Sequence, residues 1–162
     1  MIDLDRVKLA IFDFDDTLAI RTDHRAFTAD QVKCYHKNVV SGDITVWDSC
    51  IVSDAMHDFI TMCVNKGIRT GLMSATESYI HMTLKHDWVL LKYGVDMENF
   101  CVGRIEHKAS MLEYIAQANN LSNNEILLID DLYSTLASAS NLGFQCASPI
   151  EVAAYMDTFI SL

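Results

Sequence analysis

Short apolar runs recur along this chain, separated by longer stretches in which apolar residues return at helical spacing. A strand that is covered on both faces of a sheet is apolar along its whole length, so the runs predict the buried strands of a parallel sheet. The predicted strands cover residues 7–12, 68–73, 100–102, 125–129 and 144–147.

The stretches between the runs predict helices, which form the crossovers between parallel strands. A glycine follows several of these stretches and predicts the helix end, at Gly67, Gly94 and Gly143. The sequence Ser148-Pro149-Ile150-Glu151 has the spacing of a capping box with proline at the first helical position. The predicted helices cover residues 29–38, 51–66, 77–93, 109–118, a stretch ending at 142, and a C-terminal helix from 149.

Two of these helices have a recognisable apolar face. The predicted buried faces are Ile51, Ala55, Phe59, Met62 and Cys63 in the first, and Ile80, Leu84, Trp88 and Leu91 in the second. Alternating strands and helices predict an α/β protein with a parallel sheet covered on both faces. In such sheets, ligand-binding residues gather at the carboxyl ends of the strands.

Composition limits the protein class. The chain has 162 residues, 51% of them hydrophobic and 21% charged, which predicts one ordinary globular domain over residues 1–162. A net charge of −10 disfavours an extensive nucleic-acid-binding surface, although it leaves a local basic strip open. The five cysteines are widely spaced without a C-x-x-C pair, so we expect buried, reduced thiols. With no signal peptide and no long apolar run, the prediction is a soluble, cytoplasmic protein.

Acidic residues follow two of the predicted strands. Asp13 and Asp15 come directly after the first strand, and Asp130 and Asp131 follow the strand at 125–129. Carboxylates held this close raise one another's pKa unless a cation separates them, and their oxygens are the ligands that Mg²⁺ prefers. The ordinary interpretations are an acidic loop with helix caps and a solvated turn.

A hydroxyl and a lysine complete the set. Ser74 follows the second predicted strand, where its hydroxyl could bind a phosphate oxygen, although an ordinary N-cap is the simpler interpretation. Lys108 opens a helix, where a positive charge is slightly unfavourable, so either a nearby anion or an exposed position is expected. The recurrence of such residues at strand ends and helix starts favours one common site.

The sequence Asp13-Phe14-Asp15-Asp16-Thr17-Leu18 resembles the first motif of the haloacid dehalogenase superfamily, Asp-x-Asp-x-Thr/Val-Leu/Val. Ser74, Lys108 and Asp130-Asp131 resemble the remaining three motifs in order and spacing. The resemblance covers most of the chain except residues 19–50. It implies a Rossmann-like three-layer sandwich with helices on both faces, strand order 5-4-1-2-3, and a Mg²⁺-dependent phosphatase.

The resemblance also implies a role for each residue. Asp13 would be the nucleophile that forms an aspartyl-phosphate, and Asp15 the general acid and base. Ser74 and Lys108 would bind the phosphate, and Thr17 would support the loop or the phosphate. Asp13, the Asp15 carbonyl and Asp130 would bind the metal. Asp131 would orient metal-bound water or Lys108. Because the fourth motif has no further acid at positions 134 or 135, the role of Asp131 stays open.

The segment at 19–50 is too short for a full helical cap domain, so we expect a small cap-like insertion and an open site. Such a site suits a phosphorylated macromolecule, or a small substrate enclosed by a neighbouring subunit in a homo-oligomer. Residues 19–40 contain Arg21, Arg25, Lys33 and Lys37 against two acids, which either steers an anionic substrate or forms one face of a solvated helix.

Two alternatives belong to other functional classes. A receiver-like signalling domain needs a phosphoacceptor aspartate at the end of a middle strand, but Asp54 and Asp58 fall in a predicted helix. A non-catalytic phosphate- or metal-binding regulatory domain would have the same fold. The presence of every motif residue favours the phosphatase.

Overall fold

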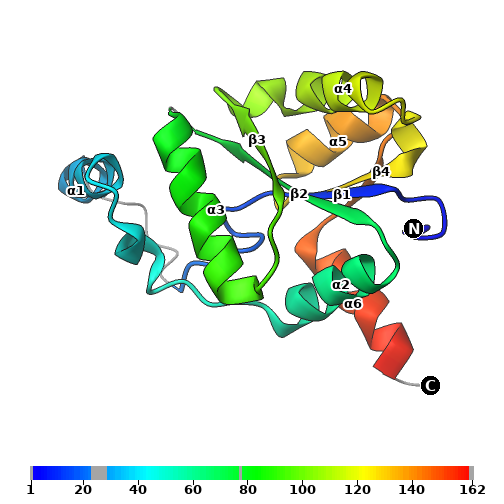
Figure 1. Ribbon diagram of the computed structural model, residues 1–162, viewed down its shortest axis with the longest axis horizontal. Coiled ribbons are helices and arrows are strands. Elements are labelled where there is room, and N and C mark those ends of the chain that lie inside the picture. Colours follow the sequence, from blue (N-terminus) through cyan, green and yellow to red (C-terminus); the bar gives the residue numbers. More distant parts are fainter. Residues whose placement is uncertain (1, 23–28, 77, 161–162) are drawn as a thin grey trace.

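The computed structural model describes residues 2–22, 29–76 and 78–160. Five parallel strands form one sheet in the order β3-β2-β1-β4-β5, which confirms the predicted order (Figure 1). The strands are β1 (Leu9–Phe12), β2 (Arg69–Ala75), β3 (Glu98–Val102), β4 (Ile126–Ile129) and β5 (Gln145–Ala147).

Helices cover both faces of the sheet, giving the predicted three layers (Figure 1). One core cluster joins the sheet to α2, α3 and α6, and the other joins it to α4 and α5. These helices are α2 (Asp54–Asn65), α3 (Tyr79–Tyr93), α4 (Lys108–Ala118), α5 (Tyr133–Asn141) and α6 (Pro149–Ile160).

The central strand β1 explains why its sequence is apolar without alternation. Ala10 and Phe12 belong to the first core cluster, whereas Leu9 and Ile11 belong to the second, on the opposite face. All four residues are completely buried. Because successive side chains of a strand point to opposite faces, a strand with helices on both sides must be apolar at every position.

The predicted helix ends are confirmed. Gly67, Gly94 and Gly143 all have positive φ angles, of 72°, 69° and 87°, and Gly94 is the left-handed C-cap of α3. At the start of α6, the Glu151 carboxylate accepts a hydrogen bond from the Ser148 amide at 2.7 Å, and the Ser148 hydroxyl accepts one from the Glu151 amide at 3.3 Å. The predicted capping box is therefore present.

The predicted apolar face of α3 is only partly correct, since Trp88 is buried and Leu84 packs against the core. Ile80 and Leu91 are 57% and 71% exposed, while the buried face contains Met82, Lys85, Trp88 and Val89. The apolar pattern alone selects a face that avoids Lys85, but the real helix turns this lysine inward. The face of α2 is partly correct, since Phe59 and Cys63 are buried, whereas Ile51 precedes the helix and pairs with Ile20.

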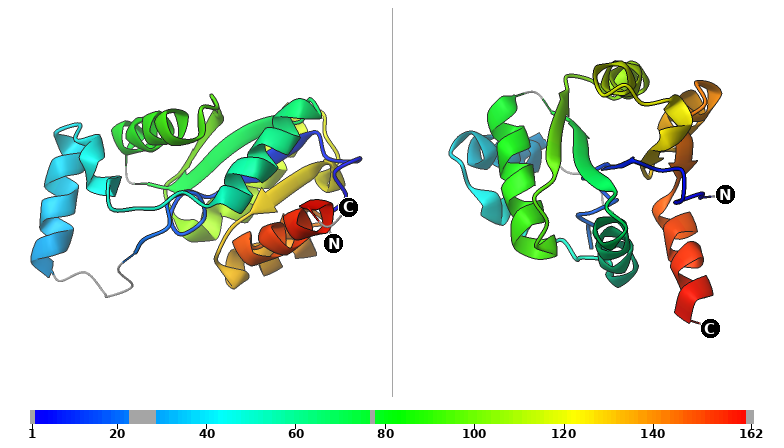
Figure 2. Two further views of the ribbon diagram at one scale, coloured as in Figure 1. Left: turned by 90° about the horizontal axis from the view of Figure 1, so that it is seen from below. Right: turned by 45° about the vertical axis from the view of Figure 1, so that its right-hand side comes forward.

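Residues 19–50, called the insertion below, contain helix α1 (Ala29–Val40), which confirms the predicted helix, and the 3-10 helix η1 (Ile44–Trp47). Both pack next to α3, at one end of the molecule (Figures 1 and 2). The side chain of Trp47 lies edge-on to Phe14, with ring centroids 5.1 Å apart, and stacks on His81 at 5.8 Å. The insertion is thus attached to the core through Trp47.

The cysteines are free thiols, as expected, but only Cys63 is fully buried and Cys34 is exposed. Across the described ranges, every helix is too short or too polar to cross a lipid bilayer.

Candidate active site

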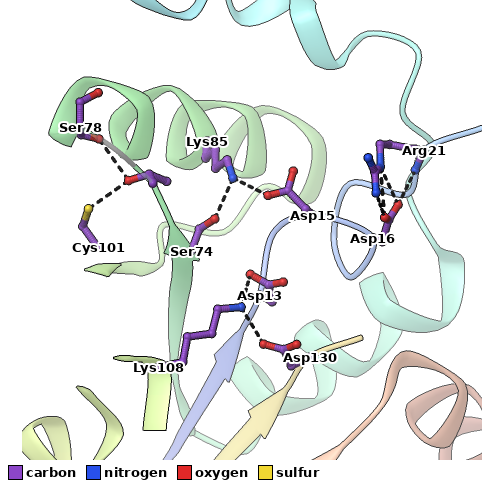
Figure 3. A network of polar contacts seen from close by, with 11 residues as sticks. Asp13, Asp15, Asp16, Arg21, Ser74, Ser78, Lys85, Cys101, Lys108 and Asp130 are labelled. Atoms are coloured by element: carbon purple, nitrogen blue, oxygen red, sulfur yellow. Dashed lines mark hydrogen bonds and ion pairs between the residues drawn. The ribbon is translucent and has the colours of Figure 1, made fainter. Parts of the chain in front are cut away.

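The loop after β1 directs two carboxylates to the carboxyl edge of the sheet (Figure 3). Between Asp13 and Asp15, the Phe14 ring is completely buried and lies edge-on to Trp47 and Trp88, at 5.1 and 5.4 Å between centroids. Side chains alternate along extended backbone, so anchoring Phe14 in the core leaves both neighbouring carboxylates for the pocket. The Asp-Phe-Asp sequence therefore orients Asp13 and Asp15 locally.

Asp16 and Arg21 hold the next part of this loop. Asp16 adopts a left-handed backbone with φ of 53°, which a short polar residue tolerates better than most. Its carboxylate accepts hydrogen bonds from the Arg21 guanidinium and from the Arg21 backbone amide, the latter at 3.2 Å (Figure 3). This pair places Arg21 at the rim of the pocket.

Lys108 lies between two carboxylates. Its Nζ is 2.8 Å from Asp13 Oδ1 and 2.7 Å from Asp130 Oδ2, and the Lys108 side chain is only 2% exposed (Figure 3). Of the two alternatives expected for a lysine at a helix N-terminus, a nearby anion or an exposed position, the structure shows the first. Asp130 Oδ1 also accepts a hydrogen bond from the Leu132 amide at 2.9 Å, so the carboxylate is held on both sides.

Burial and charge perturb this group of residues. Burial raises the pKa of Asp13 to about 7, and Asp130 and Asp15 add to the rise while Lys108 opposes it. Burial alone would lower the pKa of Lys108, but Asp13 and Asp130 together raise it. Partial desolvation of its carboxylate and the charge of Asp130 raise the pKa of Asp131. Carboxylates that repel one another in this way favour a bound cation.

Ser74 is a strand residue rather than a helix cap, because β2 continues to Ala75 and Ser78 caps α3. Its buried hydroxyl accepts a hydrogen bond from Lys85 Nζ at 2.7 Å. The same nitrogen is 2.5 Å from Asp15 Oδ2, so one lysine joins the ends of two neighbouring strands (Figure 3).

Sequence reasoning did not identify Lys85 as a site residue. The available signal was its spacing: Lys85 lies three residues after Met82 and three before Trp88, on the buried face of α3. A lysine on a buried helix face needs an anionic or hydrogen-bonding partner, because an isolated buried charge is strongly unfavourable.

Three carboxylates could hold a metal ion. Oxygens of Asp13, Asp130 and Asp131 all lie within 4.8 Å of one another, and the first two side chains are buried while Asp131 is exposed. An all-oxygen set of negatively charged ligands suits Mg²⁺ better than a softer metal. The donors therefore fit the metal predicted from the sequence.

The pocket at this edge has a volume of about 170 Å³. Asp13, Asp15, Ser74, Lys108 and Asp131 line it, together with Asp16, Arg21, Ala75, Ile105 and Leu132. Thr17 is not among these lining residues. Its side chain is completely buried, and its hydroxyl has no hydrogen-bond partner among the described residues.

The basic strip predicted over residues 19–40 is divided in the structure. Arg21 lines the pocket and binds Asp16, whereas Lys33 and Lys37 are exposed on α1. Arg25 lies outside the described residues.

No family model and no curated protein sequence matches this chain. Among solved structures, it is similar to the cobalt-bound deoxy-D-mannose-octulosonate 8-phosphate phosphatase of Haemophilus influenzae, with a TM-score of 0.54, 14% identity, and coverage of 90% of this chain and 70% of the phosphatase. A haloacid dehalogenase family enzyme of Bacteroides thetaiotaomicron, in complex with magnesium and inorganic phosphate, has a TM-score of 0.58, 13% identity, and coverage of 88% and 93%.

A third similar structure is CbbY of Rhodobacter sphaeroides in complex with xylulose 1,5-bisphosphate, with a TM-score of 0.61, 10% identity, and coverage of 88% and 85%. At such low identity the likeness concerns the fold. The strand order and the long shared coverage agree with the family that the four motifs resemble. The chain therefore has the fold of the haloacid dehalogenase superfamily.

Proposed function

We propose that this protein is a Mg²⁺-dependent phosphatase that hydrolyses a phosphomonoester through an aspartyl-phosphate on Asp13. The observation that carries the proposal is the convergence of Asp13, Asp15, Ser74 and Lys108 on one pocket at the carboxyl edge of the sheet. Similarity to the structure of one phosphatase and to that of a magnesium- and phosphate-bound enzyme supports this class of reaction.

In the first step, a carboxylate oxygen of Asp13 forms a bond to phosphorus while the bond between phosphorus and the ester oxygen breaks. The carboxyl group of Asp15 gives its proton to the departing oxygen, which leaves as an alcohol. In the second step, Asp15 takes a proton from water, and the water oxygen displaces Asp13 from phosphorus. Inorganic phosphate is released, and both aspartates return to their starting forms.

Lys108 and Ser74 would bind the phosphoryl oxygens during both steps. Lys108 already contacts Asp13 at 2.8 Å, so its charge would stabilise the nucleophile and the negative oxygens that approach it. Thr17 is proposed to support the loop from inside the core, since it does not line the pocket.

Mg²⁺ would be held by Asp13, Asp130 and the Asp15 carbonyl, with Asp131 binding the metal or its water molecules. When bound, it would supply positive charge that offsets the repulsion between the carboxylates and a phosphate dianion. The proposed location is cytoplasmic, in line with the reduced cysteines.

The pocket suggests the general kind of substrate. Arg21 is the one lining residue from the 19–50 insertion among those that the structure describes, so this insertion closes little of the pocket. We propose that the substrate is either a phosphorylated macromolecule or a small phosphorylated molecule that a second subunit encloses. A phosphorylated polynucleotide end is one of the macromolecular substrates considered.

The test is hydrolysis of para-nitrophenyl phosphate with Mg²⁺, followed by a screen of sugar phosphates, nucleotides, phosphopeptides and phosphorylated polynucleotide ends. Asp13→Asn provides the blank, because the amide keeps the shape of the side chain but is a poor nucleophile. Equal, measurable rates for the wild type and this variant would exclude Asp13 as the nucleophile, whereas a wild type that hydrolyses none of these esters would favour a non-catalytic binding domain.

A further inference from the structure

Lys85 is a second buried lysine that contacts two residues of the pocket lining, Asp15 and Ser74, and none of the steps above uses it. Its side chain is 1% exposed and extends from the middle of α3 toward the loop after β1 and the end of β2 (Figure 3). Its Nζ also lies 4.8 Å from the centre of the Phe14 ring, a favourable distance for a cation above an aromatic face. Three different residues thus contact one ammonium group.

Stability alone does not account for this arrangement. Burying an ammonium group is unfavourable, and replacing a buried ion pair by apolar side chains is often neutral or stabilising. The partner carboxylate of Asp15 is 49% exposed, so water could solvate it without Lys85. A methionine on the apolar face of α3 would satisfy the core equally well.

The hydrogen bonds of Lys85 restrict the two groups that it contacts. An ammonium group only donates, so Ser74 Oγ accepts in this bond, and its single proton remains for another acceptor. A phosphoryl oxygen in the pocket would be such an acceptor. Lys85 also engages Oδ2 of Asp15 at 2.5 Å, which leaves Oδ1 to carry the proton that is transferred.

We propose that Lys85 is a positioning residue that orients Asp15 for proton transfer and makes Ser74 a hydrogen-bond donor to the phosphoryl group. This inference rests on the proposed phosphatase activity. The two buried lysines then have different roles. Lys108 stabilises the nucleophile Asp13 and the ligand Asp130, whereas Lys85 arranges the proton donor and the phosphate-binding hydroxyl.

The dependence on the leaving group tests this difference between the lysines. An alkoxide must be protonated as it leaves, whereas para-nitrophenolate is stable without a proton. Losing the orientation of Asp15 should therefore slow an alkyl phosphate far more than an aryl phosphate. A general loss of structure would slow both by the same factor.

The experiment measures kcat/KM of the wild type and of Lys85→Met for glycerol 2-phosphate and para-nitrophenyl phosphate. We expect a fall on the order of 100-fold for the alkyl ester and under about tenfold for the aryl ester, since a general acid contributes roughly 10²–10⁴-fold. Inhibition by inorganic phosphate should weaken in the same variant, because Ser74 loses its orientation. Lys92→Met, which replaces an exposed lysine on the same helix, is the matched control and should leave both rates unchanged.

A double-mutant cycle gives a second measurement. In an Asp15→Asn background, Lys85→Met should no longer change the ratio of the two rates, because the proton donor is already absent. If Lys85→Met does not fold, as judged by its thermal melt, Lys85→Gln replaces it and should shift the ratio in the same direction.

Equal losses on both esters in a folded variant would overturn the role of Lys85 while leaving the phosphatase proposal intact. A wild type that hydrolyses neither ester would overturn the proposed function, and this inference with it.

Discussion

The carboxyl edge of the sheet and the insertion at residues 19–50 differ in how far their charged side chains are exposed to water. At the edge, Asp13, Asp130 and Lys108 are buried and in direct contact. In the insertion, Lys33 and Lys37 are exposed, and the Lys33–Asp30 pair is 3.9 Å apart between side chains that are 80% and 97% exposed. Buried charges depend on their partners, whereas exposed charges are screened by water and salt. The edge should therefore be sensitive to single substitutions and the insertion tolerant of them.

The largest effect is expected at Asp13. Asp13→Asn should reduce turnover of para-nitrophenyl phosphate on the order of 10⁴-fold, by analogy with the loss of other catalytic nucleophiles. The amide should fold, because it removes a charge that burial already disfavours. A steady-state assay with a matched thermal melt checks both points. Retention of more than a tenth of the wild-type rate, a threshold on the order of 1 kcal/mol in activation free energy, would exclude Asp13 as nucleophile.

Lys108 should affect activity and stability together. Lys108→Met leaves Asp13 and Asp130 buried without their shared cation, and breaking such a pair costs about 3–5 kcal/mol. We expect a fall in kcat/KM on the order of 100-fold as well, because one positive charge at the phosphoryl group is lost. Chemical denaturation and kinetics measure the two effects, with Lys37→Met as the exposed control. If kcat/KM did not change, another lysine would have to be the residue that binds the phosphate.

Mg²⁺ should stabilise the edge without affecting the insertion. Binding to the native carboxylates raises stability by about 2.7 kcal/mol at a concentration 100 times the dissociation constant. The melting temperature should therefore rise with Mg²⁺ in the wild type, more strongly in Lys108→Met, and little in Asp130→Asn. Differential scanning fluorimetry with and without EDTA measures these shifts. If Mg²⁺ did not change the melting temperature of the wild type, Asp13, Asp130 and Asp131 would not form a metal site.

The smallest effect is expected in the insertion. The double variant Lys33→Gln/Lys37→Gln should change the melting temperature little and leave saturated turnover of para-nitrophenyl phosphate unchanged, because exposed pairs contribute about 0–1 kcal/mol. Replacing Arg21 as well should raise KM for an anionic substrate at low salt, since this residue lines the pocket. Kinetics at two salt concentrations separate these cases. A loss of kcat in the double variant would place α1 within the catalytic machinery.

The amino-acid pattern was sufficient to predict the sheet, its helices and the ends of β1 and β4, although β2 extends to Ala75, two residues beyond its predicted end. A strand between two layers of helices must be apolar at every position, so β1 and β4 were recognisable, and the acids that follow them could lie only at the carboxyl edge. Glycines and the capping box at Ser148 marked the helix ends because those conformations depend on nearby residues alone. The motif residues at Asp13, Asp15, Ser74, Lys108, Asp130 and Asp131 could be located from the sequence as well, because each lies near the end of a predicted strand or the start of a predicted helix.

Which side chains meet depends instead on the folded chain. Lys85 and Asp15 are 70 residues apart, and their contact depends on how α3 rotates against the sheet, which the apolar pattern of that helix predicted only in part. The same holds for Trp47, which attaches the insertion to Phe14, and for Thr17, which lies in the core instead of the pocket. Periodicity records which residues avoid water, but a buried lysine avoids water only because distant oxygens compensate its charge, and only the folded chain brings those oxygens to it.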